Sequence, residues 1–173
     1  MRGSGSVMHA AKFIPWNILP WTVVAPTMTA NMETFEALVR AETRLWNQLD
    51  RVLVDQQQLP LGWLVALRVV QASPGGRVQD LAAHLDISAG GASKLVDRLV
   101  SAGLVDRAAD ASDRRASRLS LTASGALAAR RGSESAEAWL AARFERLGRQ
   151  EASQLSTLVA DLSRQVAAEG RVA

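Results

Sequence analysis

The sequence predicts a mainly α-helical protein with one small β-hairpin near its middle. Three observations support this fold class. Apolar residues recur at spacings of three and four over most of the chain after residue 30, which is the pattern of amphipathic helices. Two short runs between residues 104 and 122 alternate instead with a period of two, and turn-forming residues separate them. A length of 173 residues suits one domain with appendages.

The first two predicted helices lie on either side of a proline. The first covers Glu33 to about Gln58 and carries one apolar stripe, made of Leu38, Ala41, Leu45, Leu49, Val52 and Leu53. Pro60 fits the first turn of the second helix, which covers residues 61–73 and is apolar on nearly every side. For residues 1–30 we expect a leader or a poorly ordered extension outside the fold.

Two short helices joined by a tight turn come next. In RVQDLAAHLDIS the apolar residues fall at i, i+3, i+4 and i+7, which predicts a helix of about three turns. Ser88 can cap the following helix, AGGASKLVDRLVSAGL, by accepting from a backbone N–H. Gly103 ends that helix at a position that favours a left-handed residue. Two such helices form a helix-turn-helix unit.

A hairpin follows this unit directly. LVDRA and SRLSLT are short strand candidates, and ADASDRRA between them is rich in turn formers. A helix-turn-helix followed by a hairpin is a winged helix-turn-helix, here over residues 60–122. The arginines of DASDRRASR would then occupy the tip and outer face of the wing.

The terminal helices carry more apolar surface than this module can cover. After Thr122 we expect a long helix, broken near Gly132, and a last helix separated from it by GRQE. The last helix has a clear stripe of Leu155, Leu158, Val159, Leu162 and Val166. Since apolar helix faces must be buried, we expect residues 33–58 and 123–170 to form the dimerisation region of a two-fold homodimer.

Composition narrows the functional classes. The chain has 20 Lys+Arg against 17 Asp+Glu and no cysteine, and its two histidines lie far apart. We therefore expect no disulfide, no metal site and no cofactor. No nucleophile–base set or paired-carboxylate spacing is visible, which disfavours an enzyme. The apolar stretch near the start is interrupted by prolines and is too short to span a membrane.

The central module carries residues suited to nucleic acid. On its second helix, the side chains and glycines that can face the major groove or a phosphate are Ser88, Gly90, Gly91, Ser93, Lys94 and Arg98. In the wing, the candidates are Asp113, Arg114, Arg115 and Arg118. Asp113 could hold the Arg115 guanidinium in a bidentate pair, and an arginine in a narrow minor groove reads its shape. Taken alone, each of these features is also compatible with a solvated surface.

From Arg77 to Gly125 the sequence resembles the MarR family of bacterial regulators. The resemblance rests on RVQDLAAHLDIS, on LVDRLVSAGLVDR and on DASDRRASRLSLTASG, which contains Asp-x-Arg followed by Leu-Thr-x-x-Gly. It implies a homodimeric cytoplasmic repressor or activator that binds a pseudo-palindromic operator in double-stranded DNA. By the family pattern, Arg115 is the minor-groove residue. The glycines at 90 and 91 replace bulkier residues of the family, and Pro60 stands where a hydroxyl cap is frequent.

The resemblance also implies release of DNA by a small aromatic effector. The crevice for it would involve Trp46, Trp63 and Arg68. Tryptophans at helical spacing are also ordinary core residues, so that interpretation stays open. A second hypothesis is a winged-helix module that binds protein and not DNA. Substitution of Arg115 by alanine separates the two, since only a DNA regulator should lose operator affinity.

Overall fold

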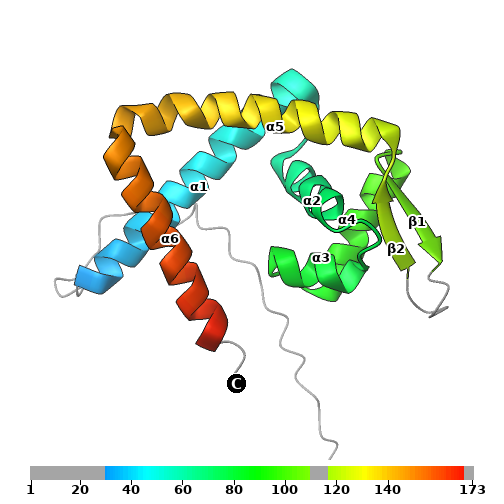
Figure 1. The fold of residues 1–173 in the computed structure, drawn as a ribbon, viewed down its shortest axis with the longest axis horizontal. Coiled ribbons are helices and arrows are strands. Elements are labelled where there is room, and N and C mark those ends of the chain that lie inside the picture. Colours follow the sequence, from blue (N-terminus) through cyan, green and yellow to red (C-terminus); the bar gives the residue numbers. More distant parts are fainter. Residues whose placement is uncertain (1–29, 110–116, 170–173) are drawn as a thin grey trace, which may run out of the picture. The chain divides into compact units, whose positions relative to one another are not determined.

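The computed structural model describes residues 30–109 and 117–169. Within them the order of elements is α1 (Ala30–Gln57), α2 (Leu61–Ala72), α3 (Val78–Leu85), α4 (Ala89–Ser101), β1 (Val105–Ala109), β2 (Ser117–Leu121), α5 (Ala123–Phe144), the 3-10 helix η2 (Glu145–Leu147) and α6 (Arg149–Glu169) (Figure 1). The predicted class, helical with one small hairpin, is confirmed. The chain divides into two units, Met1–Val39 and Arg40–Ala173, and the second contains α2 to α6 and both strands.

Local sequence signals set most of the helix boundaries. The Ser88 hydroxyl accepts from the Gly91 N–H at 3.1 Å and caps α4, as predicted. Gly103 has a φ of 69° and lies just after α4. The turn between α3 and α4 uses Asp86, whose left-handed φ of 51° an aspartate tolerates better than most residues. α3 is shorter than expected, about two turns.

The beginning of α2 depends on a residue from α1. Pro60 precedes the helix and offers no side-chain cap. The Asp50 carboxylate in α1 accepts from the Leu61 N–H at 2.7 Å and satisfies one of the open donors of the first turn. This contact joins the two helices across the turn of residues 58–60.

Strands β1 and β2 form a two-stranded antiparallel sheet, which we call the wing. Val105 pairs with Leu121, and Arg107 pairs with Leu119. The outer edge of β2 is bonded to the loop before α3: Gly75 N–H donates to Leu119 O, and Leu119 N–H donates to Gly76 O, each at 2.9 Å. The wing is thereby fixed along one edge to the helix-turn-helix.

The core lies where α2 contacts α3, α5 and the wing. Leu53, Leu64, Leu67, Leu81, Leu99 and Val105 are the largest fully buried side chains there, together with Val96 and Leu119. α5 faces α2 with a stripe of small buried residues, Gly125, Ala129, Gly132 and Ala136. A Cβ at Gly132 would lie 2.9 Å from methyl groups of Leu59 and Leu64, so glycine permits this close approach.

Two sequence predictions about the last helices were wrong. α5 runs unbroken through Gly132, because this glycine is a packing position and not a helix end. Of the predicted separator GRQE, only Gly148 lies outside a helix; it has a φ of 93°, and α6 begins at Arg149. In the described part of the chain, the helices are all too short or too polar to cross a membrane.

Candidate nucleic-acid interface

Helix α4 separates an apolar face from a polar one. Ala92, Val96 and Leu99 are fully buried against the core, while Lys94 and Arg98 are exposed and Ser93 is half-buried. This is the division that the sequence predicted. The outward face therefore presents two cations and a hydroxyl on one side of a rigid helix, which is suitable chemistry for phosphate oxygens and base edges.

The N-terminal turn of α4 is open to solvent. Ser88, Gly90 and Gly91 are all exposed. A Cβ at Gly90 would meet no atom within 4 Å, so nothing inside the protein requires a glycine there. A glycine in a helix costs about 1 kcal/mol relative to alanine. The absent side chain leaves the backbone of this turn open to close approach by a partner from outside.

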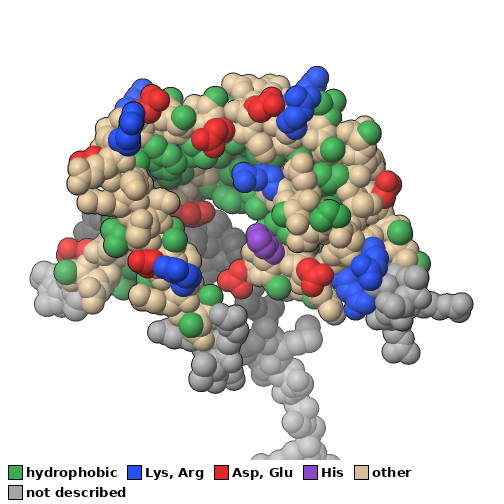
Figure 2. All heavy atoms as spheres, viewed as in Figure 1, with side chains coloured by type: hydrophobic (Ala, Val, Ile, Leu, Met, Phe, Trp, Pro, Cys, Tyr) green, Lys and Arg blue, Asp and Glu red, His purple; other side chains and the backbone are tan. Residues whose placement is uncertain are grey.

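The wing supplies further cations, only some of which lie in the described residues. Asp113, Arg114 and Arg115 lie outside them. Arg118, on β2, is exposed, and its Nη1 donates to the Gly75 carbonyl at 3.2 Å. Figure 2 shows Lys and Arg side chains gathered near the hairpin end that Figure 1 labels β1 and β2.

An ion pair that sequence reasoning missed joins the wing to α4. Arg107 Nη1 of β1 lies 3.1 Å from Asp97 Oδ1 of α4. Both residues belong to LVDRLVSAGLVDR, but the sequence spacing of ten gives no indication that a strand residue reaches back to the helix. The hairpin register, which could have revealed it, becomes definite only in the folded structure.

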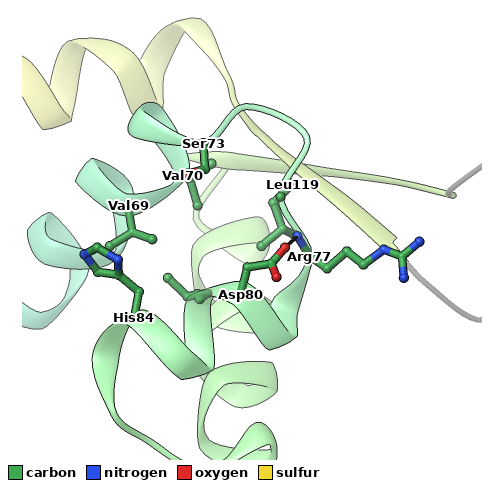
Figure 3. A pocket seen from close by; sticks show the side chains of 9 residues that line it. Val69, Val70, Ser73, Arg77, Asp80, His84 and Leu119 are labelled. Carbon is green, nitrogen blue, oxygen red and sulfur yellow. Dashed lines mark hydrogen bonds between the residues drawn. The ribbon is translucent and has the colours of Figure 1, made fainter. Parts of the chain in front are cut away.

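A small pocket lies where α2, α3 and β2 meet (Figure 3). Its volume is about 160 Å³, and Val69, Val70, Leu81 and Leu119 provide its apolar wall. The Asp80 carboxylate accepts from the Arg77 N–H at 2.7 Å, which fixes the first turn of α3. The Arg77 guanidinium extends away from the pocket in Figure 3.

The three residues predicted for an effector crevice are not brought together in one described cavity. Trp63 lines two hollows, one of about 250 Å³ with Leu104, Leu127 and Arg131 and one of about 440 Å³ beside the C-terminal part of α4. Neither is lined by Trp46 or Arg68. Both of those residues are exposed. Within the described residues, no group of three or more His, Cys, Asp or Glu side chains could hold a metal ion.

Comparison with known proteins identifies the family of this arrangement. Residues 57–116 match the sequence model of the MarR family. These residues contain α2, α3, α4 and β1. The winged-helix region is a MarR-family domain. The exposed face of α4 and the wing are therefore the corresponding parts of a MarR winged helix.

Solved MarR-family structures share the fold over most of this chain. The transcriptional repressor CouR, bound to a 23-mer DNA duplex, is 26% identical; the match covers 79% of this chain and 99% of CouR, with a TM-score of 0.69. A mutant MarR from E. coli, complexed with operator DNA, is 18% identical, with 76% and 94% covered and a TM-score of 0.70.

A third similar structure contains a small aromatic acid. This MarR-family protein from Mycobacterium tuberculosis, in complex with p-aminosalicylic acid, is 26% identical over 75% of this chain and 97% of its own, with a TM-score of 0.61. A comparison with curated protein sequences finds no match.

Proposed function

We propose that this chain is a sequence-specific DNA-binding transcriptional regulator, acting as a repressor. The observation that carries the proposal is the exposed face of α4, where Lys94, Arg98 and Ser93 stand opposite a fully buried apolar face. A helix so divided can enter the major groove while its other side stays in the core. CouR, at 26% identity, is a repressor bound to DNA, which supports the same role here.

The proposed contacts divide between the two grooves. At the exposed N-terminus of α4, where the Ser88 hydroxyl caps the Gly91 N–H, the glycine backbone at Gly90 and Gly91 would let a phosphate approach closely, and the helix dipole favours that anion. Ser93, Lys94 and Arg98 would contact base edges or phosphates of the major groove. Asp113, Arg114, Arg115 and Arg118 would serve the minor groove from the wing, with Arg115 inserted.

We further propose that the regulator is a homodimer. On α6, Leu155, Leu158, Val159, Leu162 and Val166 are 41–66% exposed along one stripe. In the part of α1 that belongs to the second unit, large apolar residues are exposed as well, among them Leu45, Trp46 and Val54. A second copy that buries these faces would present two recognition helices to successive turns of a duplex, about 34 Å apart. The operator would then be pseudo-palindromic.

Release by a small aromatic ligand is the last part of the proposal. Trp63 borders the cavity of about 250 Å³ between α2 and α5, and this cavity also has the cation Arg131 at its wall. An aromatic ring and a guanidinium suit an aromatic carboxylate. The Mycobacterium tuberculosis relative with p-aminosalicylic acid supports the ligand class. Such a ligand would displace DNA only by favouring a dimer form with another spacing.

Selection of bound fragments from random duplex DNA tests the proposal. We expect an inverted repeat, bound with an affinity that falls steeply as salt rises. Lys94→Ala should weaken binding and reduce the salt slope by about 0.9 for each lost phosphate contact. Arg130→Ala is the control, because Arg130 is also an exposed cation and lies on α5, paired with Glu134.

The alternative, a module that binds protein and not DNA, predicts different results. It predicts no enriched sequence and a binding curve that is flat in salt. It also predicts that Arg115→Ala and Lys94→Ala have no effect on any residual DNA binding. Such results would exclude the regulator.

A further inference from the structure

The buried residues of the wing belong to two pairs of its sheet, Val105–Leu121 and Arg107–Leu119. Only Val105 is buried on β1, and Leu119 is the buried residue of β2. Leu119 lies opposite Arg107 in the strand register. Beyond these two pairs, Ala108 and Ala109 are exposed and do not pack against the core. A two-stranded hairpin alone is marginally stable in water, so the direction of the wing depends on the contacts that these two pairs make with the rest of the protein.

The two edges of the wing are held by different interactions. On the β2 edge, two backbone hydrogen bonds of 2.9 Å join Leu119 to Gly75 and Gly76, and Arg118 adds a bond of 3.2 Å to the Gly75 carbonyl. The β1 edge has no neighbouring strand in the described structure. There the Arg107–Asp97 ion pair, at 3.1 Å, reaches across to α4.

We infer that Asp97 and Arg107 are positioning residues that fix the wing relative to the recognition helix α4; this inference rests on the proposed function. Asp97 is an anion on a helix that is to lie against phosphates, where a carboxylate by itself would repel the partner. Its charge is met by Arg107, which lies on the wing edge that has no backbone hydrogen bond to another described segment. The pair therefore sets the distance between the major-groove helix and the minor-groove arm.

Because the pair is exposed, we expect it to affect the orientation of the wing more than the free energy of unfolding of the protein. The side chains are 32% exposed for Arg107 and 60% exposed for Asp97. Ion pairs this open to water contribute little to the free energy of unfolding. Restricting the direction of a hairpin takes less free energy than stabilising the fold. The restriction affects binding because a freely moving wing would have to be ordered when both grooves are contacted at once.

Asp97→Asn gives the sharpest test, because two explanations predict opposite signs. If Asp97 is merely a surface anion near DNA, its removal should strengthen operator binding. If it positions the wing, removal should weaken binding by about 1.4-fold to fivefold, the range that an exposed pair supplies. Asp106→Asn is the matched control: Asp106 is an exposed anion on the same strand, and no ion pair to a described residue involves it. Its removal should leave binding unchanged or stronger.

Three further measurements separate positioning from direct DNA contact. Arg107→Gln should weaken binding as much as Asp97→Asn, and the double variant should be no weaker than either single one. Arg107→Lys should restore most of the loss. The salt slope should stay at its wild-type value in all of them, since no phosphate contact is removed. A slope reduced by about one in Arg107→Gln would make Arg107 a DNA contact and overturn the inference.

A readout without DNA keeps this inference distinct from the proposed function. Hydrogen–deuterium exchange of the free protein should be faster in residues 105–109 and 117–121 for Asp97→Asn and Arg107→Gln, and unchanged for Asp106→Asn. Unchanged exchange in the wing would overturn the inference whatever the DNA result. If the wild type selects no duplex, the proposed function fails, while the exchange data still decide whether the pair holds the wing.

Discussion

Replacing Gly125 with alanine should destabilise the protein, although alanine is the better helix former. Gly125 lies in the first turn of α5, and its N–H donates to the capping Thr122 hydroxyl at 2.9 Å. A Cβ at this position would overlap the carbonyl oxygen of Leu104 and lie 2.8 Å from the Leu104 carbonyl carbon. These are backbone atoms, so no change of rotamer relieves the overlap, and α5 must move away from the turn after α4.

That movement would weaken the hydrogen bonds that join the two segments. Thr122 Oγ1 donates to Gly103 O at 2.7 Å, and Thr122 N–H donates to Leu104 O at 3.2 Å. Overpacking costs about 1–3 kcal/mol and a weakened hydrogen bond about 1 kcal/mol, against a helix-propensity gain of up to about 1 kcal/mol. The expected net loss in the free energy of unfolding is therefore about 2–4 kcal/mol.

Urea-induced unfolding, followed by far-UV circular dichroism at one protein concentration, measures this loss. Gly90→Ala is the matched control, because the same substitution in the first turn of α4 places a Cβ where it meets nothing within 4 Å. Gly90→Ala should be as stable as the wild type or slightly more stable. A wild-type urea midpoint for Gly125→Ala, or an equal loss in both variants, would show that the Cβ does not clash with the Leu104 backbone.

Three other substitutions test separate parts of the structure. Ser88→Ala removes the acceptor for the Gly91 N–H and should cost about 1 kcal/mol, seen as a lower thermal midpoint; an unchanged midpoint would mean that water replaces the cap. Leu67→Ala, at a fully buried position, should cost about 2–5 kcal/mol in urea unfolding, and a loss below about 1 kcal/mol would contradict the core described above. Leu158→Glu, at a side chain that is 66% exposed, should retain the helical circular dichroism signal but halve the mass seen in sedimentation. A wild-type mass for that variant would rule out α6 as the dimer contact.

The parts of the fold that the sequence predicts correctly depend on neighbours in the chain. Ser88 and Thr122 as helix caps, and Gly103 after α4, are local features of the backbone that one turn of sequence defines. The period-two runs likewise place β1 and β2 within a residue or two. The polar face of α4 follows from the same 3.6-residue pattern that buries Val96.

The parts that could not be predicted depend on contacts between distant residues. The hydrogen bond from Leu61 N–H to the Asp50 carboxylate can be predicted only when the arrangement of α1 and α2 is known. The sequence predicted a helix break at Gly132, because the close approach of Leu59 and Leu64 to this glycine cannot be seen in the sequence. The Arg107–Asp97 pair needs the hairpin register. The wing tip, with Asp113, Arg114 and Arg115, lies outside the described residues and stays a prediction.

Because α5 is one continuous helix, a tilt at one end displaces the other end. A helix of 22 residues is about 33 Å long, so a tilt of roughly five degrees at the Phe144 end displaces the Gly125 end by about 3 Å. Because glycine lets that end seat directly on the Leu104 backbone, the displacement passes to the turn that connects the recognition helix to the wing. A shift of this size exceeds the tolerance of a hydrogen bond. A small tilt of α5 far from the DNA can thus move the recognition helix and the wing out of alignment with the two grooves.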